Sequence, residues 1–273
     1  MTPLEEYYNK FNEEKRLDSR HGQIEFITSM KYIHRWLGEL MRLRGTEDKS
    51  RIRIFDIGAG PGRYAIPLSE EGYDVSALEL VKHNLSRMKK NGPLVKARQG
   101  NALNLKKYAD QSFDLTLLFG PMYHLCSEEE KVQALKEALR VTKEDGIVLV
   151  AYIMNDYSIL TYAFKERHVL EALKEGKIDQ DWKCVDDPAD LYSRVRLSDV
   201  ERLNELAGAQ RVQVISADGP ANYMRREVNA LTQEEFEKFI EYHLATCERP
   251  DLMGASGHIV DMIRVKKEIY EHA

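Results

Sequence analysis

The segment RIRIFDIGAGPGRYAIPL at residues 51–68 sets the architecture of the chain. Its first half is a short apolar run rich in β-branched residues, which is typical of a buried parallel strand. Glycines follow at positions 58, 60 and 62, and the spacing of Tyr64, Ala65 and Leu68 then predicts a helix. The segment is therefore expected to form a strand, a glycine turn and a helix start, where free backbone N–H groups meet a ligand.

Two classes of nucleotide ligand suit such a turn. A dinucleotide-binding G-x-G-x-x-G motif would need its third glycine at position 63, which is Arg63, so a nicotinamide-dependent oxidoreductase is disfavoured. The strand also ends in Asp56, and a carboxylate suits a cationic ligand better than a pyrophosphate. The segment resembles the first motif of class I S-adenosylmethionine-dependent methyltransferases, an acidic residue followed by G-x-G-x-G. The resemblance implies S-adenosylmethionine as the cofactor, bound here by Asp56, Gly58, Ala59, Gly60 and Gly62.

Later strand ends extend the predicted cofactor site. Residues 73–79 read as a second strand that ends in Glu79, about 20 residues past the first glycine, where an acidic residue grips a ribose diol. A third strand at 94–99 leads to Asn101, where the family has an acidic residue near the adenine amino group; an amide can also accept that hydrogen bond. A fourth strand at 112–119 ends in GPMYHL, similar to the family's fourth motif. These loops add Leu80, Ala102, Phe119 and Gly120 to the predicted cofactor contacts.

The remaining pattern predicts a doubly wound α/β fold. A helix at 127–141, a buried strand at 146–153, a helix at 197–207, a strand at 211–216 and a helix at about 232–247 follow in order. The alternating run at 258–265 is a final edge strand, antiparallel in the family. The resemblance thus implies a mostly parallel seven-stranded sheet. Residues 1–50 are expected to form an N-terminal helical cover, and residues 51–273 the Rossmann-like domain, with a capping insertion at about 154–196.

The composition restricts the cellular setting. The chain has 273 residues, a formal net charge of −5 and only three cysteines, which contain no C-x-x-C pair. We expect a cytoplasmic protein, a monomer or homodimer, with no secretory signal, no membrane span and no bound metal. The absence of a basic face argues against nucleic acid as a partner.

Methyl transfer from a sulfonium needs alignment and exclusion of water more than proton transfer. If a base is used, the candidates at the end of the fourth strand are His124 and Tyr123. Tyr7, Tyr8, Arg16 and Glu25 are further candidates if the N-terminal helices close over the site. The predicted substrate contacts are Tyr7, Tyr8, Arg16, Tyr123 and His124.

The sequence predicts an S-adenosylmethionine-dependent methyltransferase that acts on a small molecule. Two alternatives stay open: a nucleic-acid or protein methyltransferase, and a protein that binds S-adenosylmethionine without turnover. The acceptor atom is not readable from the sequence.

Overall fold

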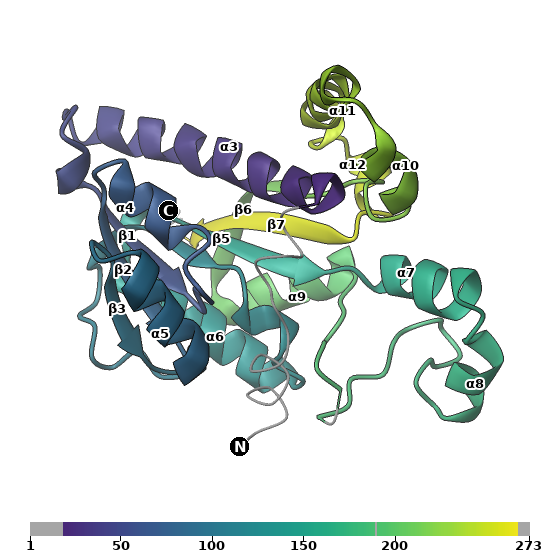
Figure 1. Cartoon of the computed structure of the whole chain (residues 1–273). Helices are drawn as coiled ribbons and strands as arrows, with labels where there is room; N and C mark the ends of the chain where they lie inside the picture. Colours follow the sequence, from purple (N-terminus) through teal and green to yellow (C-terminus); the bar gives the residue numbers. More distant parts are fainter. Residues whose placement is uncertain (1–18, 189, 267–273) are drawn as a thin grey trace, which may run out of the picture.

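The computed structural model describes residues 19–188 and 190–266 of the chain, so the predicted contacts Tyr7, Tyr8 and Arg16 lie outside the described residues. Seven strands form one sheet in the order β3-β2-β1-β4-β5-β7-β6 (Figure 1). The strands are β1 (Arg53–Ile57), β2 (Asp74–Glu79), β3 (Lys96–Gln99), β4 (Phe113–Leu118), β5 (Thr142–Ile153), β6 (Ala209–Ser216) and β7 (His258–Val265).

The first five strands pair in parallel, whereas β7 pairs antiparallel with both β5 and β6. This topology confirms the predicted doubly wound, seven-stranded sheet with an antiparallel last strand. The prediction that the last strand lies at an edge was wrong, because β7 pairs with both β5 and β6 and leaves β6 at the edge. The parallel strands share one carboxyl edge, and the order reverses between β1 and β4, which is where ligands of open α/β sheets bind.

Helices cover both faces of the sheet. They are α3 (Arg20–Leu43), α4 (Ala65–Glu70), α5 (Lys82–Asn91), α6 (Glu128–Val141), α7 (Asn155–Ser158), α8 (Val169–Lys174), α9 (Leu197–Ala207), α10 (Arg225–Ala230), α11 (Gln233–Thr246) and α12 (Pro250–Met253). Short 3-10 helices occupy Lys49–Arg51 and Pro121–Tyr123, and a π-helix occupies Ile159–Lys165. None of the helices in these two described stretches is long and apolar enough to cross a bilayer.

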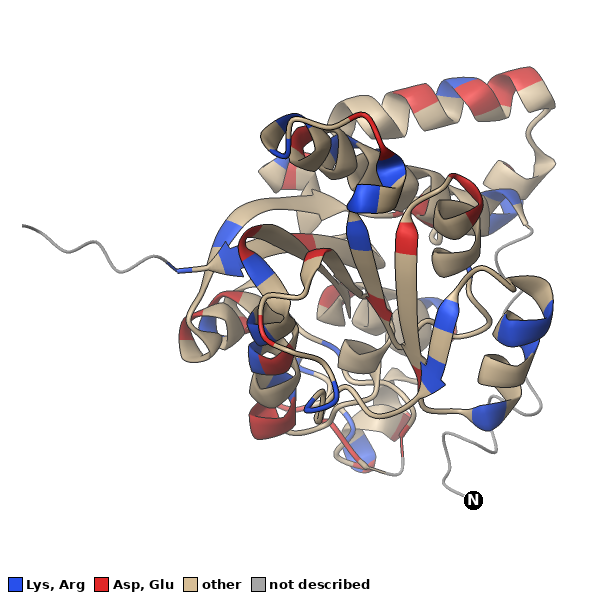
Figure 2. Ribbon diagram, turned by 90° about the vertical axis from the view of Figure 1, so that its left-hand side faces the viewer, with Lys and Arg blue, Asp and Glu red and all other residues tan. Residues whose placement is uncertain are grey.

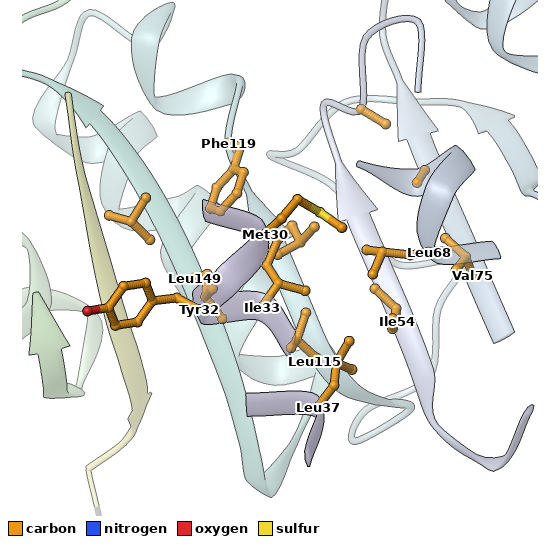
Figure 3. Close-up of a cluster of buried hydrophobic side chains, with 14 of the residues drawn as sticks. Met30, Tyr32, Ile33, Leu37, Ile54, Leu68, Val75, Leu115, Phe119 and Leu149 are labelled. Atoms are coloured by element: carbon orange, nitrogen blue, oxygen red, sulfur yellow. The ribbon is translucent and has the colours of Figure 1, made fainter. Parts of the chain in front are cut away.

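The alternation of side chains along the strands explains the two layers. In β1, Ile54 belongs to the core that packs under α3, α4 and α5, while its neighbour Phe55 packs into the core under α6 and α9. Figure 3 shows the first of these cores, in which Ile33 and Leu37 of α3 meet Leu115 of β4. The apolar face of α3 is therefore part of the main core, and this helix holds its N-terminal end near the carboxyl edge of the sheet.

Several predicted boundaries moved for local reasons. The helix predicted from the spacing of Tyr64, Ala65 and Leu68 begins at Ala65, because residues 60–64 continue the turn. β5 begins at Thr142 rather than 146, and α10 and α12 had no clear periodic signal. Ser127 and Glu130 form a reciprocal cap at the start of α6, and Gly208 ends α9 with a φ of 70°. The domain boundary near residue 50 stays a prediction.

Candidate active site

The glycine turn after β1 is hydrogen-bonded to the neighbouring strand β2. The carbonyl oxygen of Leu78 accepts hydrogen bonds from the N–H groups of Gly58 and Ala59, at 2.8 and 3.1 Å. The Glu79 carboxylate then accepts from the N–H of Gly60 at 2.8 Å and, through its other oxygen, from the N–H of Val81 at 2.8 Å. One buried carboxylate thus holds the turn after β1 and the turn after β2 in fixed positions.

The three glycines of the motif serve different purposes. A Cβ on Gly58 would lie 2.5 Å from Pro121, and a Cβ on Gly120 would lie 2.9 Å from the carbonyl oxygen of Gly58, so these glycines let the turns after β1 and β4 touch. Gly60 has a φ of +57° and no atom within 4 Å of the position where a Cβ would stand. Only Gly60 keeps space open for a ligand.

Gly62 requires a correction to the predicted cofactor contacts. It is buried and is not among the residues that line the cavity at this edge. A Cβ at this position would come within 2.8 Å of Ile66 and 2.9 Å of Met88. The third glycine of the motif therefore permits close packing of the turn against α4 and α5, which is a structural role.

A cavity of about 460 Å³ opens at the carboxyl edge of the sheet. Every predicted cofactor residue except Gly62 lines it: Asp56, Gly58, Ala59, Gly60, Glu79, Leu80, Asn101, Ala102, Phe119 and Gly120. Asn101 is exposed, and its side-chain oxygen accepts a hydrogen bond from the N–H of Leu103 at 3.0 Å, so this oxygen also shapes the loop. The cavity follows the ends of β1, β2, β3 and β4 in turn.

Asp56 is the most perturbed group in this cavity. Its side chain is only 1% exposed, and one carboxylate oxygen, Oδ2, has no hydrogen-bond partner in the described part of the chain. Burial, together with the negative charge of Glu79, raises the pKa of Asp56 to about 7, and a hydrogen bond from the Ala65 backbone opposes the shift. Burial also raises the pKa of Glu79, against hydrogen bonds that lower it. Two buried carboxylates at adjacent strand ends need a cationic, hydrogen-bonding ligand.

The predicted catalytic pair lies at the other end of the same cavity. Tyr123 and His124 both line it, beyond the turn at residues 120–122. The Nδ1 atom of His124 donates to the carbonyl oxygen of Leu191 at 2.6 Å, and the N–H of Ser193 donates to the carbonyl oxygen of Tyr123 at 2.7 Å. The insertion is therefore fixed to the fourth-strand turn, and its Tyr157 and Tyr192 complete this part of the wall.

Sequence reasoning missed part of the wall. Asn222 and Arg225, from the segment after β6, and His258, the first residue of β7, also line the cavity. Glu25 of α3, a candidate already named from the sequence, lines it as well. His258 pairs with Ile153 at the end of β5. Since the last strand was expected to be antiparallel, its first residue should lie at the carboxyl edge of the parallel strands, and this signal could have identified His258.

Comparisons with known proteins show that the fold is shared with methyltransferases. The model of a family described as a methyltransferase domain matches residues 55–150. A possible histamine N-methyltransferase from Thermotoga maritima superposes with a TM-score of 0.52 at 19% identity, covering 97% of this chain and 100% of that one. The CcbJ methyltransferase from Streptomyces caelestis superposes with a TM-score of 0.55 at 13% identity, covering 97% and 96%.

The matches to curated relatives cover only part of each protein. A glycine/sarcosine N-methyltransferase from Aphanothece halophytica is 24% identical over 168 residues, which are 55% of this chain and 62% of the relative. A ubiquinone biosynthesis O-methyltransferase from Rickettsia canadensis (strain McKiel) is 26% identical over 110 residues, 39% of this chain and 44% of the relative. The matches thus span less than two thirds of either relative. The match to a methyltransferase-domain model over residues 55–150 and the fold shared with these solved structures are in keeping with the resemblance to class I S-adenosylmethionine-dependent methyltransferases.

Proposed function

We propose that this protein transfers a methyl group from S-adenosylmethionine to a small molecule by in-line displacement. The observation that carries the proposal is Asp56: a buried carboxylate with an unpartnered oxygen, in a cavity beside a second buried carboxylate, Glu79. S-adenosylmethionine brings the donors that this arrangement lacks, because it carries an ammonium group and a ribose diol. A pyrophosphate in the same position would face both carboxylates.

The residues around the cavity fit the parts of this cofactor in order. Asp56 would accept from the ammonium group, and the Glu79 carboxylate, which holds the N–H groups of Gly60 and Val81, would accept from the ribose hydroxyls. Asn101 and Ala102 would lie at the adenine, and the open space at Gly60 would take the ligand against bare backbone. When bound, the cofactor supplies an activated methyl group on its sulfonium.

The chain's own part in the reaction is alignment and exclusion of water. The cofactor half of the cavity ends at Phe119 and Gly120, and the acceptor half begins at Tyr123 and His124. Tyr157 and Tyr192 of the insertion cover this half, which supports a substrate of small-molecule size. Tyr7, Tyr8 and Arg16 remain proposed substrate contacts.

The proposed partners follow from charge and cysteine content. Figure 2 shows basic and acidic segments interspersed over the ribbon, which supports a small-molecule substrate over nucleic acid. All three cysteines are free, in keeping with a reducing cytoplasm. We propose a cytoplasmic monomer or homodimer.

The function is tested by incubating the purified protein with methyl-labelled S-adenosylmethionine and fractions of a small-molecule cell extract. We expect label in one or a few fractions with the wild-type protein and none with Gly60→Val, which fills the cofactor space. Cofactor binding without label in any fraction would instead support the non-catalytic alternative.

A further inference from the structure

Asp218, in the loop after β6, is fully buried and bound on both oxygens. Its Oδ1 accepts from the hydroxyl of Ser256 at 2.7 Å and from the backbone N–H of His258 at 2.9 Å. Its Oδ2 accepts from the amide of Asn222 at 2.6 Å and from Nδ1 of His258 at 2.7 Å. Burial alone would raise the pKa of Asp218, but the charge and hydrogen bonds of His258, with that of Ser256, lower it overall. Asp218 is therefore a carboxylate that fixes the His258 ring.

The backbone is shaped for this contact. A Cβ on Gly257 would lie 2.7 Å from Oδ2 of Asp218 and 3.2 Å from the amide nitrogen of Asn222, so only glycine lets β7 approach this closely. β7 runs antiparallel to β5, which places His258 at the carboxyl edge of the sheet, on the wall of the acceptor half. The His258 ring lies 5.8 Å from the ring of Tyr123.

The hydrogen bond assigns the tautomer of His258. A carboxylate only accepts, so Nδ1 carries the proton and Nε2 is the basic nitrogen of the neutral ring. A carboxylate oxygen of Glu25, which also lines the cavity, lies 3.7 Å from Nδ1. A protonated His258 would therefore be stabilised by two carboxylates, which is how a general base is held ready.

The same three residues also meet a geometric test for a metal site, since their ligand atoms lie within 4.8 Å of one another. The hydrogen bonds speak for a proton-transfer site instead. Nδ1 is protonated, and each oxygen of Asp218 already accepts two hydrogen bonds, so these atoms would have to lose partners to bind an ion.

We propose that His258 is the general base of the reaction, that Asp218 is its positioning residue, and that the methyl acceptor is an amine. The proposal rests on the methyltransferase function above. In the first step an acceptor ammonium gives a proton to Nε2 of His258, which leaves a neutral amine and an imidazolium. In the second the amine nitrogen lone pair forms the N–CH₃ bond while the S–CH₃ bond breaks, its electron pair stays on sulfur, and the products are a methylammonium and S-adenosylhomocysteine.

The charges on the wall favour an amine over an anionic oxygen acceptor. The cavity is lined by four carboxylates, Glu25, Asp56, Glu79 and Glu130, and by two guanidinium groups, Arg63 and Arg225. The negative groups outnumber the positive ones, so the wall disfavours a phenolate or carboxylate acceptor. The same carboxylates attract an ammonium. The groups that face His258 are Glu25 from α3, Tyr123 from the turn after β4 and Asp218 from the loop after β6.

The base is tested with His258→Asn, because the asparagine amide can still donate to Asp218 from the position of Nδ1 but has no Nε2. With the labelled extract as acceptor, we expect about 10²- to 10⁴-fold less label at pH 7. The loss should shrink as the pH rises and the amine loses its proton unaided, while cofactor affinity stays unchanged. His34→Asn, on the outer surface of α3 where His34 meets Glu71, should keep the wild-type profile. A wild-type rate for His258→Asn at pH 7 would overturn the proposal.

The acceptor class is tested by acetylating half of the extract with an active ester and then treating it with hydroxylamine, which restores hydroxyls but leaves amines blocked. Label taken up from the untreated half should fall at least tenfold in the acetylated half. Equal label in both halves would overturn the amine assignment while leaving the methyltransferase function intact. Failure of the protein to bind S-adenosylmethionine would instead refute the proposed function, on which this inference rests.

Discussion

Replacing Asp56 by Asn should make the protein more stable and less able to bind its cofactor. Asp56 is 1% exposed, and burial with the nearby charge of Glu79 raises its pKa to about 7, from an ordinary value of 3.8. A difference of this size corresponds to about 4 kcal/mol. The folded protein holds this proton more tightly than the unfolded chain, so the free energy of unfolding falls as the pH rises from about 4 to 7.

Asparagine has no charge to bury and does not titrate. The gain in the free energy of unfolding from Asp56→Asn should therefore be larger at pH 8 than at pH 5, by about 2.5 kcal/mol from the same linkage relation. Urea denaturation of both proteins without cofactor, at several pH values, measures this directly. Cofactor affinity should fall by about 10- to 100-fold, because a charged hydrogen bond is lost.

Asp114 provides the matched control. It is equally buried, but it accepts hydrogen bonds from Arg44 at 3.0 Å, Lys143 at 2.7 Å and the backbone N–H of Arg53 at 2.9 Å. Asp114→Asn should therefore destabilise the protein, since it removes the negative charge that faces the partly buried cations of Arg44 and Lys143. If Asp56→Asn raised the free energy of unfolding equally at pH 5 and pH 8, the raised pKa of the buried Asp56 carboxyl would be refuted.

Three further results are expected. Gly60→Val should abolish cofactor binding. Gly45 has nearly the same φ (+58° against +57°) and equally empty surroundings, so Gly45→Val should lower stability to a similar degree and leave binding intact. Calorimetric titration of both variants measures this, and retained binding by Gly60→Val would contradict the cavity assignment. Glu79→Ala should weaken binding by about 2 kcal/mol, roughly thirtyfold, and wild-type affinity in the same titration would remove the ribose role. Deletion of residues 1–18 should change cofactor affinity by less than about tenfold, or 1.4 kcal/mol, yet abolish methyl transfer to the extract; normal turnover would strike Tyr7, Tyr8 and Arg16 from the site.

The sequence predicted which strand-end residues line the cavity at the carboxyl edge, because each of them is placed locally. Asp56, Gly60 and Glu79 each stand at the end of a strand or in the turn after it, and parallel strands bring such ends together whatever the details of packing. The exception was Gly62, whose role depends on the neighbouring side chains of Ile66 and Met88, which no motif specifies.

The acceptor half could not be predicted in the same way, because it is assembled from distant segments. Glu25 lies more than 190 residues before both Asp218 and His258 in the sequence, and Asp218 lies in a loop without periodic pattern. Their meeting depends on where α3 crosses the sheet and on the reversed direction of β7. His124 was chosen for its place in a family-like motif, but its Nδ1 bonds to Leu191 and so holds the insertion in place.

The central claim, that the cavity at the carboxyl edge takes S-adenosylmethionine, is tested most directly by ligand-dependent stability. Thermal unfolding is measured alone and with S-adenosylmethionine, S-adenosylhomocysteine or NAD. A ligand at 100 times its dissociation constant adds about 2.7 kcal/mol to the free energy of unfolding. We predict stabilisation by S-adenosylmethionine and S-adenosylhomocysteine and none by NAD. Stabilisation by NAD alone would contradict the account.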